Sequence, residues 1–205
     1  KIKNRYRNKS SNIQEIFTMF TSGSTGIPKG IVHSKNGYLV YSAFTSKNFF
    51  DLKPSSIMLC ASDAAWINGH TYSLFGPLIL GSTSILIENP ASIANPKIFN
   101  EIIKNLKPTH LYLPVTLIRL IRGIDLISIQ FKSSKSLVCI GSMGEPLSAD
   151  VGQWYANKFL QPGSPIVNTY FQTETGGILV ANKNNIKTTN YNAIGKIPNF
   201  LDLEL

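Results

Sequence analysis

The sequence predicts an α/β fold in which layered, largely parallel sheets are flanked by helices. Short runs rich in β-branched and aromatic residues alternate along the chain with longer runs whose apolar residues recur at helical spacing. Alternating strands and helices are typical of folds with largely parallel sheets. The chain has 205 residues, 43% of them hydrophobic, which is enough to bury the core of one compact domain.

The first part of the chain is expected to contain four strands and two helices. The strands are expected at residues 16–21, 30–33, 56–61 and 83–87. The helices are expected at residues 35–50 and near residues 70–80. In the first helix the residues at helical spacing are Tyr38, Tyr41 and Phe44 or Thr45.

The second part is expected to continue the alternation. Helices are expected at residues 97–106, at residues 115–122 and after Ser148, a plausible N-cap for the helix that carries Trp154 and Tyr155. Strands are expected at residues 109–113, ended by Pro114, at residues 137–140, which run into Gly141, and at residues 165–170. In the helix at 97–106 the apolar side is expected to consist of Ile98, Ile102, Ile103 and Leu106.

The net charge of +9 raises the question of a nucleic acid or an anionic membrane as a partner. Five of the 20 basic residues lie within the first nine positions, and the others are spread thinly. A nucleic-acid site needs a basic face with aromatic or groove-reading elements, and no such run is present in the sequence. We therefore interpret residues 1–15 as a solvated basic segment and expect no nucleic-acid partner.

Cys60 and Cys139 each lie in a short apolar run, which favours small buried side chains over a disulfide or a metal site. The sequence shows no signal-peptide pattern and no apolar run approaching the roughly 18 residues that cross a bilayer. We expect a cytoplasmic protein without a membrane partner. The oligomeric state stays open.

The first chemistry-bearing loop follows the first expected strand and runs from Thr21 to Gly30. It holds three glycines, four hydroxyl side chains and Lys29, a combination that suits phosphate oxygens. A Walker-type loop is excluded by spacing, because Pro28 stands where the second glycine of that motif belongs. In the parallel part of an α/β fold, the loops at the carboxyl ends of strands carry the site.

Two further loops follow expected strands. The second is Gly141-Ser142-Met143-Gly144-Glu145-Pro146, which alone is an ordinary strand-to-helix turn. The third is Asn168-Thr169-Tyr170-Phe171-Gln172-Thr173-Glu174-Thr175-Gly176-Gly177. Its aromatic pair, hydroxyls and carboxylate suit a nucleotide: a ring to stack on adenine, a hydroxyl for the α-phosphate and an acid for Mg²⁺.

The first loop resembles the phosphate-binding signature of the acyl-adenylate-forming enzymes, and the order of the three loops resembles the acetyl-CoA synthetases among them. The intervening sequence fits that group at Gly30-Ile31-Val32-His33, Gly37-Tyr38-Leu39, Ala61-Ser62-Asp63, Trp66, Gly69-His70 and Phe75-Gly76-Pro77-Leu78. The resemblance implies that residues 16–205 are the central part of the large N-terminal AMP-binding domain, truncated at both ends. The small C-terminal domain of the family lies outside this chain.

The resemblance also implies roles for the residues of the loops. The phosphate loop would comprise Thr21, Ser22, Gly23, Ser24, Thr25, Gly26 and Lys29. The nucleotide would contact Gly144, Glu145, Pro146, Asn168, Thr169, Tyr170, Phe171, Gln172 and Thr173. Tyr170 would stack on the adenine, and the Asn168 carbonyl would accept from its amino group. Lys29, Thr173 and Glu174 would be catalytic, with Thr173 at the α-phosphate and Glu174 as the ligand of Mg²⁺.

The acyl pocket implied by the resemblance is formed by Trp66, Ile67, Asn68, Met143 and Phe171. Phe171 stands where the acetyl-CoA synthetases usually have Trp, and this leaves room. Ile67 and Met143 replace valines and take volume back. Asn68 and Ser92 stand at positions linked to CoA, in place of Thr and Asn. His33 and His70 match family positions, and we interpret them as structural residues rather than catalysts.

The expected reaction is ATP-dependent activation of acetate to acetyl-AMP, followed by transfer to CoA, with ATP, CoA and Mg²⁺ required and small molecules as partners. Two alternatives stay open: the same chemistry on propionate or another short acid, and an adenylation domain that loads a carrier protein. We expect this chain alone to be inactive and to expose apolar surface where the missing parts dock.

Overall fold

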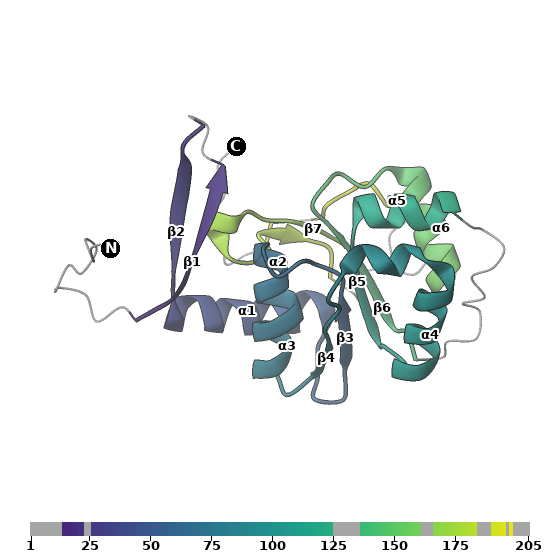
Figure 1. The fold of residues 1–205 in the computed structure, drawn as a ribbon, viewed down its shortest axis with the longest axis horizontal. Coiled ribbons are helices and arrows are strands. Elements are labelled where there is room, and N and C mark those ends of the chain that lie inside the picture. The colour runs from purple at the N-terminus through teal and green to yellow at the C-terminus, as the bar shows by residue number, and fades with distance from the viewer. Residues whose placement is uncertain are drawn as a thin grey trace.

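The computed structural model describes residues 14–22, 26–124, 136–160, 166–183, 190–195 and 197–198. Its main sheet has six strands in the order β4, β3, β5, β6, β7, β8 (Figure 1). These strands are β3 (Ile57–Cys60), β4 (Thr83–Ile85), β5 (His110–Pro114), β6 (Cys139–Met143), β7 (Ile166–Tyr170) and β8 (Val180–Ala181). The strands from β4 to β7 are parallel, and β8 alone runs antiparallel to β7. The predicted α/β class is confirmed.

Helices cover both faces of this sheet. On one face lie α4 (Pro96–Leu106), α5 (Val115–Ile124) and α6 (Ala149–Phe159); on the other lie α1 (Lys35–Phe50), α2 (Ile67–His70) and α3 (Gly76–Ile79). Successive side chains of a strand point to opposite faces, so both faces of the strands are buried and most of their side chains are apolar. In β5, Leu111 and Leu113 face the α4–α6 side, whereas Tyr112 faces α1.

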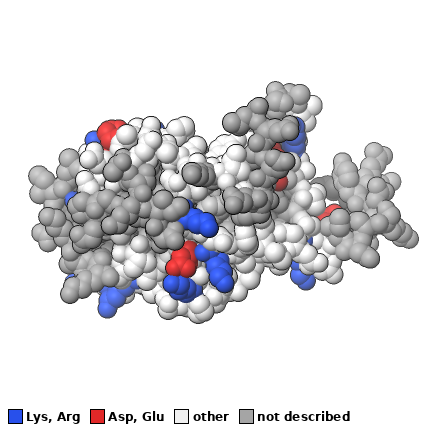
Figure 2. All heavy atoms as spheres, turned by 180° about the vertical axis from the view of Figure 1, so that it is seen from behind, with Lys and Arg blue, Asp and Glu red and all other residues white. Residues whose placement is uncertain are grey.

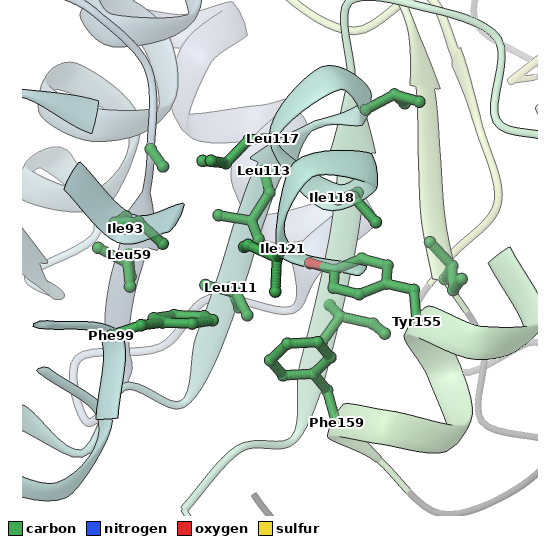
Figure 3. Close-up of a cluster of buried hydrophobic side chains, with 14 of the residues drawn as sticks. Leu59, Ile93, Phe99, Leu111, Leu113, Leu117, Ile118, Ile121, Tyr155 and Phe159 are labelled. Carbon is green, nitrogen blue, oxygen red and sulfur yellow. The ribbon is translucent and has the colours of Figure 1, made fainter. Parts of the chain in front are cut away.

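The larger core lies between the sheet and helices α4, α5 and α6 (Figure 3). Leu111 and Leu113 of β5 pack there with Ile118 and Ile121 of α5. Tyr155 of α6 points toward the α5 side chains in the same view. The core therefore fixes α5 and α6 against β5 and β6, the strands that lead toward the second loop.

Two antiparallel strands, β1 (Glu15–Ser22) and β2 (Pro28–Ser34), form a separate hairpin that extends away from the main sheet (Figure 1). The predicted strands at 16–21 and 30–33 are thus confirmed as elements. They pair only with each other and not with the main sheet. Their pairing is antiparallel because a connection of five residues is too short for a parallel crossover. Phe20 and Val32 of this hairpin are exposed.

The helix expected near residues 70–80 is a composite. It begins as α2, passes through a π-helical segment at Thr71–Phe75 and ends as α3. A π-helical turn is rare and is often found at functional sites. Among the residues of this segment, Thr71 and Tyr72 are fully buried.

Other predictions differ from the structure in detail. The strand expected at 137–140 begins at Cys139 and continues to Met143, because β5 pairs with it as far as Pro114. In α4 the buried residues are Phe99 and Ile103, whereas Ile98 and Leu106 are exposed. Ser148 is the N-cap of α6, as predicted, but its side chain makes no capping bond to the helix backbone.

Two short 3₁₀ helices, Pro90–Ala94 and Thr173–Thr175, and the edge strand β8 were not predicted. Within the described residues, no helix is both long and apolar enough to cross a membrane. On the face shown in Figure 2, several described lysine and arginine side chains gather around one acidic side chain near the lower middle, and the others stand apart. The basic segment expected at residues 1–15 lies outside the described residues except for its last two positions.

Candidate functional site

Parts of the three loops named above meet at one pocket of about 880 Å³, within the size range of small-molecule sites, and the first loop contributes Thr21 and Ser22 to it. Four separate parts of the chain supply most of its walls. They are the end of β1, the segment before α2, the turn after β6 and the end of β7 with the loop that follows. The lining residues are Met19, Phe20, Thr21, Ser22, Ala65, Trp66, Ile67, Asn68, Gly144, Glu145, Pro146, Asn168, Thr169, Tyr170, Phe171, Gln172, Thr173, Glu174 and Ile194.

The second loop leaves β6 in a sharp turn. Gly144 has a φ of 87°, a conformation that glycine adopts without the steric cost paid by other residues. Arg119 of α5 holds the turn from outside the pocket: its Nη1 donates to Glu145 Oε2 at 2.9 Å, and its Nη2 donates to the Pro146 carbonyl at 3.4 Å. The loop is therefore fixed on the helix that packs next to it.

The last residues of β7 are fixed by side-chain hydrogen bonds to β6 and β5. The Asn168 Oδ1 accepts from Ser142 Oγ at 3.0 Å, while Asn168 Nδ2 donates to the Ala193 carbonyl at 3.3 Å. The Thr169 hydroxyl donates to the Ser142 carbonyl at 2.9 Å, so Tyr112 must donate to Thr169 Oγ1 across 2.6 Å. One acceptor position of the Asn168 oxygen stays free of these bonds.

Past β7 the chain makes a single 3₁₀ turn, Thr173–Thr175, that closes on itself. The backbone N–H of Gln172 donates to Thr175 Oγ1 at 3.1 Å, and Thr175 Oγ1 donates to the Gly177 carbonyl at 3.0 Å. Tyr170 is 45% exposed, and its hydroxyl accepts from Gln172 Nε2 at 3.2 Å. Its ring is thus available at the pocket wall, while its polar end is fixed.

Phe171, Ile67 and Trp66 are the predicted acyl-pocket residues that give the pocket apolar surface. The Phe171 ring meets Tyr72 edge to face, with ring centroids 5.9 Å apart, and packs against the buried cluster that contains Met143. Ile67 is buried, whereas Trp66 is 66% exposed. Met143 is 1% exposed and does not line the pocket; it belongs to the buried cluster against which Phe171 packs.

Three other predicted site residues do not line the pocket. Lys29 is exposed on β2, opposite Thr21 in the register of the hairpin. Gly26 has a φ of 78° and no atom within 4 Å of the place that a Cβ would take, and Ser92 lies in the 3₁₀ helix Pro90–Ala94. Gly23, Ser24 and Thr25 lie outside the described residues. The roles assigned to all of these residues stay predictions.

His33 and His70 both pack against Phe17, with ring-centroid distances of 4.9 Å and 4.7 Å from its ring. Burial lowers the pKa of His33 below 6.5, with hydrogen bonding to the Thr173 backbone acting the other way. Neutral His33 therefore sits beneath the third loop, near Glu174. The Nε2 of His33 is buried without a hydrogen-bond partner, and the interpretation of both histidines as structural stays a prediction.

Sequence reasoning missed four lining residues. Met19, Phe20, Ala65 and Ile194 flank predicted segments but carry no motif of their own. The alternation of β1 could have indicated Met19 or Phe20, because the strand enters the first loop directly. Nothing in the sequence near Ile194 relates it to the loops, which end 17 or more residues earlier.

Mg²⁺ prefers oxygen ligands and usually binds one or two carboxylates together with substrate phosphates and water. Glu174 supplies one exposed carboxylate at the pocket, with the Thr173 hydroxyl beside it. The described residues contain no group of three or more His, Cys, Asp or Glu that could hold a metal unaided. This donor set fits a metal ion that arrives with a nucleotide rather than one held by protein alone.

Comparisons with known proteins point to one family. The family model described as "AMP-binding enzyme" matches residues 5–204. Acetyl-coenzyme A synthetase of Psychromonas ingrahamii is 42% identical over 166 residues, which are 81% of this chain and 26% of that protein. Acetyl-coenzyme A synthetase 2 of Saccharomyces cerevisiae is 41% identical over 166 residues, 81% of this chain and 24% of that protein.

Among solved structures, the crystal structure of the anthranilate CoA ligase AuaEII in complex with anthranoyl-AMP is similar in fold. Its TM-score is 0.75 at 21% sequence identity, covering 89% of this chain and 34% of that chain. The chain spans about a quarter of the length of the curated relatives it matches.

Proposed function

Because this chain belongs to the AMP-binding enzyme family, we propose that the protein carrying it is an AMP-forming acetate–CoA ligase. An acetate oxygen would attack the α-phosphorus of ATP, forming acetyl-AMP as pyrophosphate leaves. The thiol of CoA, losing its proton, would then attack the acetyl carbon and release AMP. The observation that carries this proposal is the convergence of the three loops on one pocket.

Such a reaction depends on positioning and on stabilising negative charge more than on a general base. Tyr170 would stack on the adenine, and the free acceptor position of Asn168 would receive its amino group. Thr173 would donate its hydroxyl to the α-phosphate. The first loop, with Lys29, would surround the outgoing pyrophosphate by backbone N–H groups and one positive charge.

Mg²⁺, when bound with ATP, would supply charge neutralisation at the phosphates. Glu174 is the residue proposed to hold it, with Thr173 next to it in the same 3₁₀ turn. Asn68 and Ser92 are proposed to contact CoA. Asn68 lines the pocket, so its role requires no rearrangement of that segment.

The size of the acid is set by Phe171, Ile67 and Met143. Phe171 occupies the apolar end of the pocket, where its ring rests on Tyr72. A larger aromatic ring would fill more of that space, so Phe171 favours a second candidate function: the same chemistry on propionate or another short acid. A methylene changes discrimination in an apolar pocket by only about 1–3 kcal/mol, so both acids are candidates.

We propose a cytoplasmic setting, in which the two buried cysteines would stay reduced. The proposed function is tested by incubating the whole purified protein with ATP, Mg²⁺, CoA and either acetate or propionate. We expect AMP and pyrophosphate in equal amounts, together with the acyl-CoA. Release of ADP and phosphate, or nucleotide turnover that ignores both acids, would contradict the proposal.

A further inference from the structure

Three hydroxyl side chains from the helices on the α1 face hold the backbone that follows Thr173 and Glu174. The Thr71 hydroxyl donates to the Gly176 carbonyl at 2.6 Å, and the Tyr41 hydroxyl donates to the Ile178 carbonyl at 2.7 Å. The Ile178 amide donates to Tyr72 Oη at 2.8 Å. We call Tyr41, Thr71 and Tyr72 the hydroxyl bracket.

Two further side chains fix the direction of every proton in this network. Thr45 donates to the Tyr41 carbonyl at 2.9 Å, so Tyr72 must donate its own hydroxyl proton to Thr45 Oγ1 across 3.0 Å. Thr71 has used its proton on Gly176, so Tyr38 must donate to Thr71 Oγ1 across 2.7 Å. Each buried hydroxyl of the network is therefore satisfied in one arrangement.

Burial makes this arrangement costly to break. Tyr72, Thr45 and Thr71 are 0% exposed, so a partner left without its bond has no water to replace it. Burial also raises the pKa of Tyr38 to about 12 and shifts that of Tyr72 further in the same direction, so both phenols stay protonated. Fully satisfied buried networks of this kind select a single geometry.

The loop has the residues that such a close approach requires. A Cβ at Gly176 would lie 2.9 Å from Tyr38 Cδ2, and a Cβ at Gly177 would lie 2.9 Å from Tyr41 Cδ1. The π-helical segment that begins at Thr71 brings two adjacent residues, Thr71 and Tyr72, onto the same stretch of loop. The Gly-Gly pair thus lets the loop pack closely against α1, and the π-helical segment supplies hydroxyls that bond the same stretch of the loop.

We propose that the hydroxyl bracket is a set of positioning residues, which fix Thr173 and Glu174 at the pocket for the α-phosphate and its Mg²⁺. None of the three bracket residues lines the pocket, so they act through the loop. The inference rests on the proposed function. The inference gives a physical reason for the sequence Gly176-Gly177-Ile178 and for the buried hydroxyls of α1 and the π-helical segment.

The test uses the whole protein with three substitutions. Tyr72→Phe removes one hydroxyl and leaves the ring; Thr71→Val removes one hydroxyl at equal size, and Thr71→Ser keeps it. With ATP, Mg²⁺ and acetate or propionate, we expect the kcat for pyrophosphate release to fall at least about fivefold in Tyr72→Phe and Thr71→Val. Thr71→Ser should stay within about twofold of the unmodified protein, and the KM for the acid should change little in all three.

Tyr155→Phe is the matched control, since Tyr155 is also 0% exposed and its hydroxyl donates to the Gly141 carbonyl at 3.3 Å in the other core. It should lose thermal stability as Tyr72→Phe does, yet keep its kcat. Equal kcat for Thr71→Val and Thr71→Ser, or an equal loss in Tyr155→Phe, would overturn the proposal.

Amide hydrogen exchange separates this inference from the proposed function. We expect the Ile178 amide to exchange at least about fivefold faster in Tyr72→Phe, because its acceptor is removed. That result in a protein that releases no pyrophosphate with either acid would contradict the proposed function and leave the loop contact standing. Unchanged exchange at Ile178 would overturn the bracket itself.

Discussion

Arg119 Nη1 lies 2.9 Å from Glu145 Oε2, and this ion pair joins α5 to the second loop. Three residues along the same helix, Arg122 Nη1 lies 2.7 Å from Asp150 Oδ2 in α6. Both pairs are partly exposed, but the first pair alone ends on residues of the pocket wall, Glu145 and Pro146. The two arginines therefore offer a comparison between holding the loop and holding a helix.

We predict that Arg119→Ala raises the KM for ATP about two- to fivefold, because the second loop loses its outer support. An exposed ion pair contributes about 0.2–1 kcal/mol, so the melting temperature should change by no more than a few degrees. Arg122→Ala serves as the control and should leave the KM for ATP unchanged. If steady-state kinetics give both variants the same KM, Arg119 has no special relation to the nucleotide.

Replacement of Phe171 by Trp should shift the choice of acid toward acetate. The larger ring would fill the space beside Tyr72 that Phe171 leaves. We expect the ratio of kcat/KM for acetate over propionate to rise at least about tenfold, with the KM for ATP nearly constant. An unchanged ratio would mean that Phe171 does not set the size of the acyl pocket.

Gly176→Ala should destabilise the protein, since the new Cβ would meet Tyr38 at 2.9 Å and φ is 70° there. The left-handed conformation alone costs about 1–2 kcal/mol for a residue with a Cβ. At Gly123 in α5 an added Cβ would meet no atom within 4 Å, so Gly123→Ala should instead stabilise by about 0.5–1 kcal/mol. Urea unfolding of the two variants measures the difference; equal free energies of unfolding would contradict the contact with Tyr38.

Acidification should destabilise the fold through His110. Burial lowers the pKa of His110 below 6.5, and the positive charge of Lys53 lowers it as well. The hydrogen bond to the Phe50 carbonyl and the negative charge of Asp51 act in the opposite direction. The unfolded chain binds a proton in a pH range where folded His110 does not, so its contribution is present above pH 6.5 and is lost as pH falls. Thermal melts at pH 7.5 and 5.5 should show a smaller loss of stability in His110→Gln than in the unmodified protein. Equal losses would show that His110 binds protons equally in the folded and unfolded states.

Much of the fold follows from local pattern. The strands and helices from β3 to β7 were predicted because buried parallel strands are apolar throughout and their connecting helices show helical spacing. The hairpin of β1 and β2 was predicted as two strands, but their pairing with each other was not predicted, since pairing partners are not encoded in the period of a strand. The π-helical segment could not be predicted, because its buried residues include the polar Thr71 and Tyr72, whose hydroxyls bond residues of α1 and backbone groups 105 or more positions later.

The candidate site could be predicted where a motif carries the chemistry in one stretch, as at Tyr170, Thr173 and Glu174. It could not be predicted where the contact depends on packing between distant elements. Arg119 is an ordinary helical residue in the sequence, and its relation to Glu145 exists only because α5 packs beside the turn after β6. Met143 illustrates the opposite case: it was expected at the pocket wall, and in the structure it is buried in the core and does not line the pocket.

The measurement that tests the central claim most directly is isotope exchange between labelled pyrophosphate and ATP, catalysed by the whole protein without CoA. Formation of a bound acyl-AMP is reversible, so we predict exchange that requires Mg²⁺ and a short acid, acetate or propionate, and that proceeds in the absence of CoA. Exchange that is absent with both acids, or that appears only when CoA is added, would contradict the assignment of this pocket to acyl-adenylate formation.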